Sequence, residues 1–141
     1  MKKILFVSCI LISNTFLFAQ FTQENDKGAL IEFDTEMIDY GTIDKGASGV
    51  RYFNFTNKGS SPLIISDVKS SCGCTVPTPS KEPVMPGKSG KIEVSYDTHR
   101  IGVFNKHLTV ISNSQDRDKI FLNIKGEVLA PKEGDEKKKK N

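Results

Sequence analysis

Cys72 and Cys74, separated only by Gly73, are the residues of this sequence best suited to carry chemistry. Two thiols this close could form a disulfide in an exported protein, and the glycine would let the backbone bend enough. The ring would be small, so such a bond would be strained and easily reduced. The thiolates could instead bind a soft metal such as copper(I) or zinc. The interpretation favoured over redox chemistry and metal binding is structural: thiols or a local disulfide without function, with one cysteine packed as a small apolar side chain and the other near the surface.

A metal site would need further ligands, and the two histidines, His99 and His107, supply the available imidazoles. His99 lies in a polar turn, and His107 lies within an expected strand. Neither histidine has a carboxylate at a spacing that identifies a catalytic triad, so we expect both on the exposed surface. No Gly-x-Ser-x-Gly motif is present either. We therefore expect no catalytic residues and no cofactor.

The elements that position these residues are expected to be strands. Short apolar stretches separated by turn residues run through residues 29–130, and apolar positions do not keep a helical spacing for more than two turns. Strict alternation in the segment around Ile92, Val94 and Tyr96 places these three side chains inward. Strands are expected at residues 29–33, 38–43, 50–57, 63–68, 91–97, 104–112 and 120–128. These seven stretches predict an all-β protein with an immunoglobulin-like β-sandwich, although alternation alone also fits a barrel.

A proline-rich loop is expected from Pro77 to Pro86, because prolines break a central strand.

The two ends of the chain differ in composition from its middle. Two lysines, a run of mostly apolar residues and Ala19 predict a secretory signal peptide over residues 1–20. Its removal would leave two cysteines in the mature chain. Residues 21–28 are polar and are expected to form a flexible leader. Residues 131–141 contain no apolar side chain and are expected to form a disordered charged tail.

The net positive charge of the chain comes from its two ends. The full sequence has 20 Lys and Arg against 17 Asp and Glu. Two of the lysines lie in the predicted signal peptide, and the tail holds five lysines and three acidic residues, which leaves 13 basic and 14 acidic residues from Phe21 to Pro131. The predicted domain is therefore close to neutral, without the clustered basic face that nucleic acid requires. We expect no nucleic-acid partner, and we expect membrane contact only through the lysine-rich tail.

Several short motifs together resemble a known family. They are Tyr40-Gly-Thr-Ile-Asp-Lys-Gly46, Phe53-Asn-Phe-Thr-Asn-Lys-Gly59, Pro62-Leu-Ile-Ile65, Ser71-Cys-Gly-Cys-Thr75, Pro86-Gly87 and Gly102-Val-Phe-Asn-Lys-His-Leu108. From about Ile31 to Val128 the sequence resembles the domain of unknown function 1573, which is related to immunoglobulin-like modules of the ASPM, SPD-2 and hydin type. The resemblance implies a β-sandwich, export, and a source among bacteria of the Bacteroidota kind. It implies no activity, and the related modules elsewhere are mostly protein-binding or scaffolding units.

We therefore expect a non-catalytic secreted protein, in the periplasm or at the cell surface, that binds or supports another cell-envelope protein. The alternative is a thiol-redox or soft-metal-handling protein that uses Cys72 and Cys74. A purely structural spacer is less favoured, because one isolated sandwich makes a short spacer.

Overall fold

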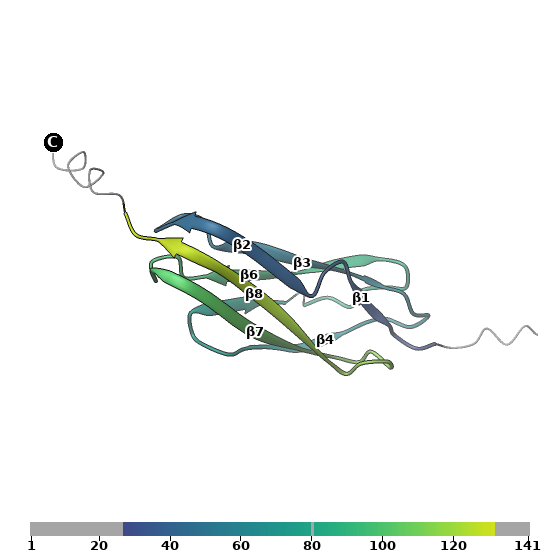
Figure 1. Cartoon of the computed structure of the whole chain (residues 1–141). Helices are drawn as coiled ribbons and strands as arrows, with labels where there is room; N and C mark the ends of the chain where they lie inside the picture. The colour runs from purple at the N-terminus through teal and green to yellow at the C-terminus, as the bar shows by residue number, and fades with distance from the viewer. Residues whose placement is uncertain (1–26, 80, 132–141) are drawn as a thin grey trace, which may run out of the picture.

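The computed structural model describes residues 27–79 and 81–131, which form two stacked β-sheets (Figure 1). The strands are β1 (Ile31–Phe33), β2 (Met37–Asp44), β3 (Val50–Asn57), β4 (Ile65–Ser70), β5 (Thr75–Thr78), β6 (Ser89–Tyr96), β7 (Gly102–Ser112) and β8 (Lys119–Leu129). The first sheet has the order β1-β3-β6-β5 and the second the order β2-β8-β7-β4. The predicted all-β sandwich is confirmed. The described residues form two separate sheets, whereas a barrel would be one sheet closed on itself.

Several predictions about the chain ends fall outside this part of the chain. The predicted signal peptide over residues 1–20, most of the leader over residues 21–28 and most of the tail over residues 131–141 lie outside the described residues. These boundaries stay predictions. Among the described residues, none belongs to a helix with the length and hydropathy needed to cross a membrane.

One strand was missed from the sequence. The predicted count of seven becomes eight because Thr75–Thr78 forms β5, at the start of the expected proline-rich loop. Pro77 is accommodated because β5 is the edge strand of the first sheet and pairs only with β6. Proline is tolerated at a sheet edge, where its missing N–H need not meet a neighbouring strand. The remaining strands were predicted to within a few residues.

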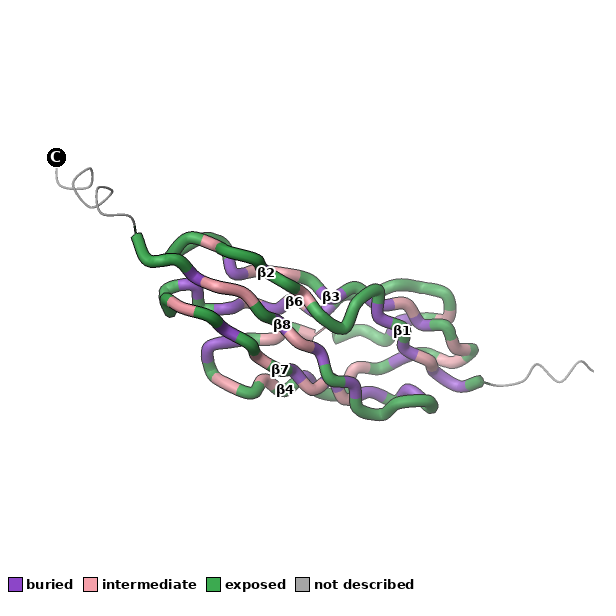
Figure 2. The backbone as a smooth tube through the Cα atoms, viewed as in Figure 1, coloured by how far each residue is buried: buried purple, intermediate pink, exposed green. Residues whose placement is uncertain are grey.

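The core lies between the two sheets and follows the predicted period of two. Ile92 and Val94 on β6 have no exposed surface, and Tyr96 is only 6% exposed. The same alternation runs along β8, where Leu122 is fully buried and its neighbour Phe121 is 67% exposed. Figure 2 shows buried and exposed positions alternating along the strands. Each sheet therefore has one buried inner face and one outer face in contact with solvent.

The first part of the chain crosses from one sheet to the other. β1 pairs antiparallel with β3 in the first sheet, and after a short bend β2 pairs parallel with β8 in the second. The register of β2 shifts between Asp39 and Thr42. Gly41 adopts a φ of 62° at this point, and its N–H donates to the Asp39 carboxylate at 2.8 Å. A glycine is needed here because other residues rarely adopt this left-handed conformation.

Three aromatic rings connect the sheets at the end where β6 meets β7. Tyr96 from the first sheet stacks on Phe104 from the second, with ring centroids 3.8 Å apart, and Tyr40 meets both rings edge-on. The Tyr40 hydroxyl donates to the carbonyl oxygen of Gly49 at 2.8 Å. Burial raises the pKa of Tyr40 to about 12. This cluster fixes the end of the sandwich from which the β6–β7 loop emerges.

Replacing neighbouring residues of β8 with aspartate tests the division into inner and outer faces. Leu122→Asp buries an unpaired carboxylate and is expected to lower the free energy of unfolding by roughly 3–5 kcal/mol. Phe121→Asp places the same charge on the outer face and is expected to change stability by less than about 0.5 kcal/mol. Urea denaturation followed by circular dichroism measures both values. Equal losses in the two variants would contradict the assignment of faces.

The raised pKa of Tyr40 predicts a loss of stability at alkaline pH. The folded protein keeps this hydroxyl neutral, whereas the unfolded chain ionises it near 10, so stability should fall as pH rises from 10 to about 12. Tyr40→Phe should lower stability at neutral pH by about 1 kcal/mol, because a buried hydrogen bond is lost. The same substitution should make the alkaline decline shallower. A decline of unchanged steepness in Tyr40→Phe would refute the role of this hydroxyl.

Candidate functional site

Cys72 and Cys74 form a disulfide in the turn that joins β4 to β5, with their Cα atoms 5.3 Å apart. This turn carries the chain from the second sheet to the first. Cys74 is 6% exposed and belongs to the hydrophobic core, whereas Cys72 is half-buried and packs against that core. The expected placement at a junction of strand and loop is therefore seen, with one cysteine packed as an apolar side chain.

Hydrogen bonds independent of the disulfide hold this turn in place. The Ser70 hydroxyl donates to the Cys72 carbonyl oxygen at 2.8 Å, and the Ser71 N–H donates to the carbonyl oxygen of His107 at 2.9 Å. The Thr75 hydroxyl oxygen, nearly inaccessible to solvent, lies 3.7 Å from Sγ of Cys72 and 4.0 Å from Sγ of Cys74. The two sulfurs therefore share the Thr75 hydroxyl as a polar neighbour.

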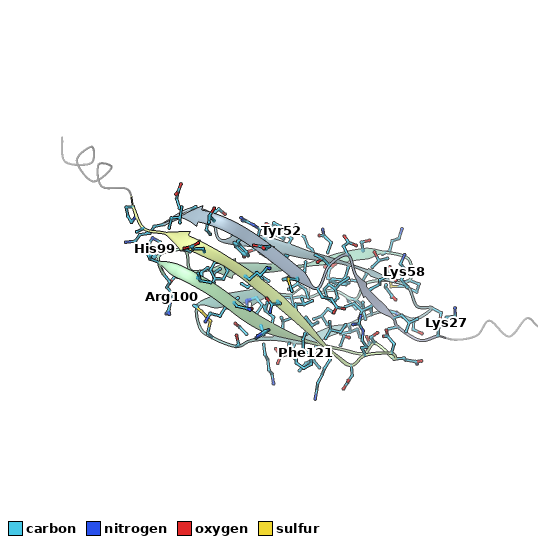
Figure 3. All side chains as sticks on the ribbon, in the orientation of Figure 1. Lys27, Tyr52, Lys58, His99, Arg100 and Phe121 are labelled. Atoms are coloured by element: carbon cyan, nitrogen blue, oxygen red, sulfur yellow. A yellow bond between two sulfur atoms is a disulfide. The ribbon has the colours of Figure 1, made fainter. Side chains whose placement is uncertain are left out.

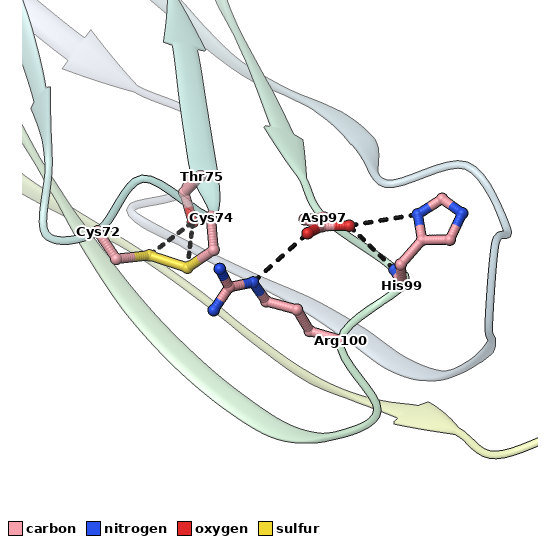
Figure 4. A network of polar contacts seen from close by, with 6 residues as sticks. All are labelled: Cys72, Cys74, Thr75, Asp97, His99 and Arg100. Atoms are coloured by element: carbon pink, nitrogen blue, oxygen red, sulfur yellow. Dashed lines mark hydrogen bonds and ion pairs between the residues drawn. A yellow bond between two sulfur atoms is a disulfide. The ribbon is translucent and has the colours of Figure 1, made fainter.

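The loop between β6 and β7 lies directly beside the disulfide. The N–H of Asp97 donates to the Cys74 carbonyl oxygen at 2.9 Å. The Asp97 carboxylate accepts the N–H of His99 at 3.1 Å and the Nε–H of Arg100 at 3.4 Å. Figure 4 shows the terminal nitrogens of Arg100 directed toward the disulfide, with His99 on the opposite side of Asp97. Antiparallel pairing of β5 with β6 thus brings a cationic side chain to the cysteine turn.

The electrostatics of this loop favour an ionised aspartate. The backbone N–H of His99 has the largest effect on the pKa of Asp97, lowering it from the ordinary value of 3.8, and the side chains of His99 and Arg100 lower it further. A hydrogen bond to the charged form stabilises that form. The carboxylate therefore stays negative at neutral pH and orients the Arg100 side chain through its Nε atom.

The two histidines lie apart from each other and have separate partners. His99 is in the β6–β7 loop, its side chain is 76% exposed, and its Nδ1 lies 3.3 Å from the Asp97 carboxylate. His107 is on β7, and its ring Nδ1 lies 3.0 Å from the side-chain nitrogen of Asn123. The part of the chain that the structure describes contains no group of three or more His, Cys, Asp or Glu able to hold a metal. The structure therefore does not assemble the histidines and cysteines into one cluster, and the metal alternative stays a prediction.

A second feature, missed in the sequence, is the outer face of the second sheet. Phe121 on β8 is 67% exposed and lies opposite Thr109 of β7, and Met37 on β2 is 52% exposed and lies opposite Asn123. We call Met37 and Phe121 with these two neighbours the outer apolar face. Figure 3 shows Phe121 at the lower edge of the sandwich, away from the end that carries His99 and Arg100. Ile120, Leu122 and Ile124 occupy alternate positions of the predicted strand 120–128, so the outward direction of Phe121 could have been inferred from the sequence.

The model of the family described as "Protein of unknown function (DUF1573)" matches residues 31–128 of this chain. The chain belongs to this family. The resemblance predicted from its motifs is confirmed. The match covers all eight strands apart from Leu129, the last residue of β8. No curated protein matches the sequence.

Solved structures with the same fold come from bacteria and from human. A protein of unknown function from Porphyromonas gingivalis W83 is similar with a TM-score of 0.66 and 17% identity, covering 77% of this DUF1573 chain and 51% of its own. The chain thus spans about half the length of that protein. The ASH/PapD-like domain 7 of human CEP192 is similar with a TM-score of 0.62 and 9% identity, covering 75% of this chain and 89% of its own. These likenesses show the fold alone, and they confirm the predicted immunoglobulin-like sandwich.

A protease shares the fold over part of its length. The VesB protease of Vibrio cholerae is similar with a TM-score of 0.58 and 15% identity, covering 69% of this chain and 31% of its own. At this identity the likeness extends to architecture and not to activity.

The lowered pKa of Asp97 gives a test of the loop geometry. Its carboxylate stabilises the folded state above the pKa of the unfolded chain, and this stabilisation is lost as pH falls through the folded pKa. Carboxyl NMR titration of the folded protein should give an Asp97 midpoint below 3.8. Arg100→Gln should raise that midpoint only slightly, because the backbone N–H of His99 still donates. A midpoint at or above 3.8 in the unsubstituted protein would show that this turn is not formed.

Proposed function

We propose that this DUF1573 protein is an exported, non-catalytic module that binds another protein of the cell envelope through its outer apolar face. The single observation that carries the proposal is the exposure of Phe121 and Met37 on the outer surface of one sheet. Large exposed apolar side chains are common in binding surfaces, and aromatic residues surrounded by polar neighbours often dominate binding energy. Thr109 and Asn123 supply such polar neighbours.

The edge strands favour binding through a sheet face, because they are poorly suited to pair with a strand of another protein. Each of the four edge strands has a feature that discourages pairing with another chain. β1 has only three residues, and β5 has four and contains Pro77. β2 and β4 each have a register shift, at Asp39/Thr42 and at Ile65/Asp67. A partner is therefore expected to contact side chains on the sheet surface.

Two observations support the exported location. Residues 1–20 have the composition of a secretory signal peptide. The disulfide between Cys72 and Cys74 is of a kind that persists in oxidising compartments such as the bacterial periplasm. Both agree with a partner in the envelope.

A crosslinking and affinity experiment on the native envelope tests this proposal. The purified protein should capture a reproducible envelope protein, and Phe121→Asp should weaken that interaction by roughly tenfold or more, as loss of an aromatic hot spot does. Tyr52→Asp is the matched control, because Tyr52 is an exposed aromatic residue on the outer face of the other sheet. Capture of no reproducible partner, or equal weakening by both substitutions, would disprove the proposal.

A further inference from the structure

The disulfide is asymmetric in its access to solvent. Cys74 is 6% exposed and packs in the core, whereas Cys72 is only half-buried at the end of the sandwich. Thiol–disulfide exchange begins with a thiolate that approaches one of the two sulfurs, so access decides which sulfur is attacked. In this chain the difference in access favours attack on the sulfur of Cys72, with the sulfur of Cys74 as the leaving group.

A thiolate leaving into the core would ordinarily be unfavourable, because burial in apolar surroundings destabilises its charge. Two neighbouring groups offset this effect. The Thr75 hydroxyl oxygen lies 4.0 Å from Sγ of Cys74 and can donate to the thiolate. The terminal nitrogens of Arg100 are directed toward the disulfide (Figure 4), and the carboxylate of Asp97 holds the Nε of that side chain. A nearby guanidinium lowers the free energy of a thiolate.

The turn has other contacts that hold it besides the disulfide. The hydrogen bonds of Ser70 to Cys72, of Ser71 to His107 and of Asp97 to Cys74 fix the turn without it. The disulfide also closes only a very short loop, with a sequence separation of 2. Closing a short loop removes little entropy from the unfolded chain, so opening this one costs little stability. These contacts and the short loop favour a folded state that tolerates opening of the bond.

We propose that the Cys72–Cys74 disulfide is a thiol–disulfide exchange site that accepts two electrons from a dithiol, with Arg100 positioned to stabilise the leaving thiolate. A thiolate of the dithiol attacks Sγ of Cys72, a mixed disulfide forms, and the bond to Cys74 breaks with its electron pair on Sγ of Cys74. The second thiolate of the dithiol then attacks its own first sulfur and releases Cys72 as a thiolate. The dithiol is oxidised to a disulfide, and both cysteines take up the two protons that it loses. This activity is independent of binding through the outer apolar face.

The test measures reduction of the purified, oxidised protein by dithiothreitol, with alkylation and mass spectrometry counting free thiols over time. Arg100→Gln is expected to slow reduction roughly two- to fivefold, the size of effect that an exposed charge gives. Arg100→Lys should restore most of the rate, since the positive charge returns. Arg117→Gln is the matched control, because Arg117 also donates to a carboxylate, that of Glu36, from the β7–β8 loop. The disulfide of the Arg117→Gln variant should be reduced at the same rate as that of the unsubstituted protein.

Single cysteine variants identify the attacked sulfur. In Cys74→Ser the remaining Cys72 thiol should form a mixed disulfide with oxidised glutathione at least about tenfold faster than the Cys74 thiol of Cys72→Ser, as its greater access requires. Circular dichroism checks that both variants are folded. The proposal is overturned if the disulfide resists dithiothreitol until the protein unfolds, if Arg100→Gln and Arg117→Gln reduce at the same rate, or if the Cys74 thiol reacts as fast as the Cys72 thiol.

Discussion

Burial of the two inner sheet faces against each other is the constraint on which the rest of the structure depends. Along β6 and β8 every second side chain is placed in this core, and Leu122 and Val94 have no exposed surface. A shift of one residue in either strand would move the apolar set into solvent, so the register is strongly fixed. The same alternation determines which side chains remain for function, because Phe121 faces outward only as a consequence of Leu122 facing inward.

The places where the chain passes between sheets are the second determinant of the structure. One lies between β1 and β2, and another lies in the turn between β4 and β5, which contains Cys72 and Cys74. A turn of this kind must meet the strand ends of both sheets. The disulfide therefore lies against the β6–β7 loop, and the Asp97 N–H that bonds to the Cys74 carbonyl also places Arg100 nearby. Packing of Cys74 in the core is therefore compatible with the proposed role of the disulfide in thiol exchange.

The sequence predicted the fold better than the site, for physical reasons. Alternation is local, so the strands and the inward side chains of β6 could be inferred from neighbouring residues. The approach of Arg100 to the cysteine turn depends on long-range pairing of β5 with β6, and no local pattern contains it. Asn57 ends the predicted strand 50–57, and no local pattern shows that it is fully buried, with its side chain bonded to backbone groups of four residues from three separate segments. A polar residue is placed in a core only when distant partners satisfy it.

Residue-resolved hydrogen exchange tests the two-sheet arrangement most directly. Amide protons are protected where strands are paired on both sides and covered by a core. Nuclear magnetic resonance should therefore find the slowest exchange in the central strands β3, β6, β7 and β8, and faster exchange in the edge strands β4 and β5. Exchange that is uniformly fast, or slowest in β4 and β5, would contradict the arrangement of two packed sheets on which both proposed activities rest.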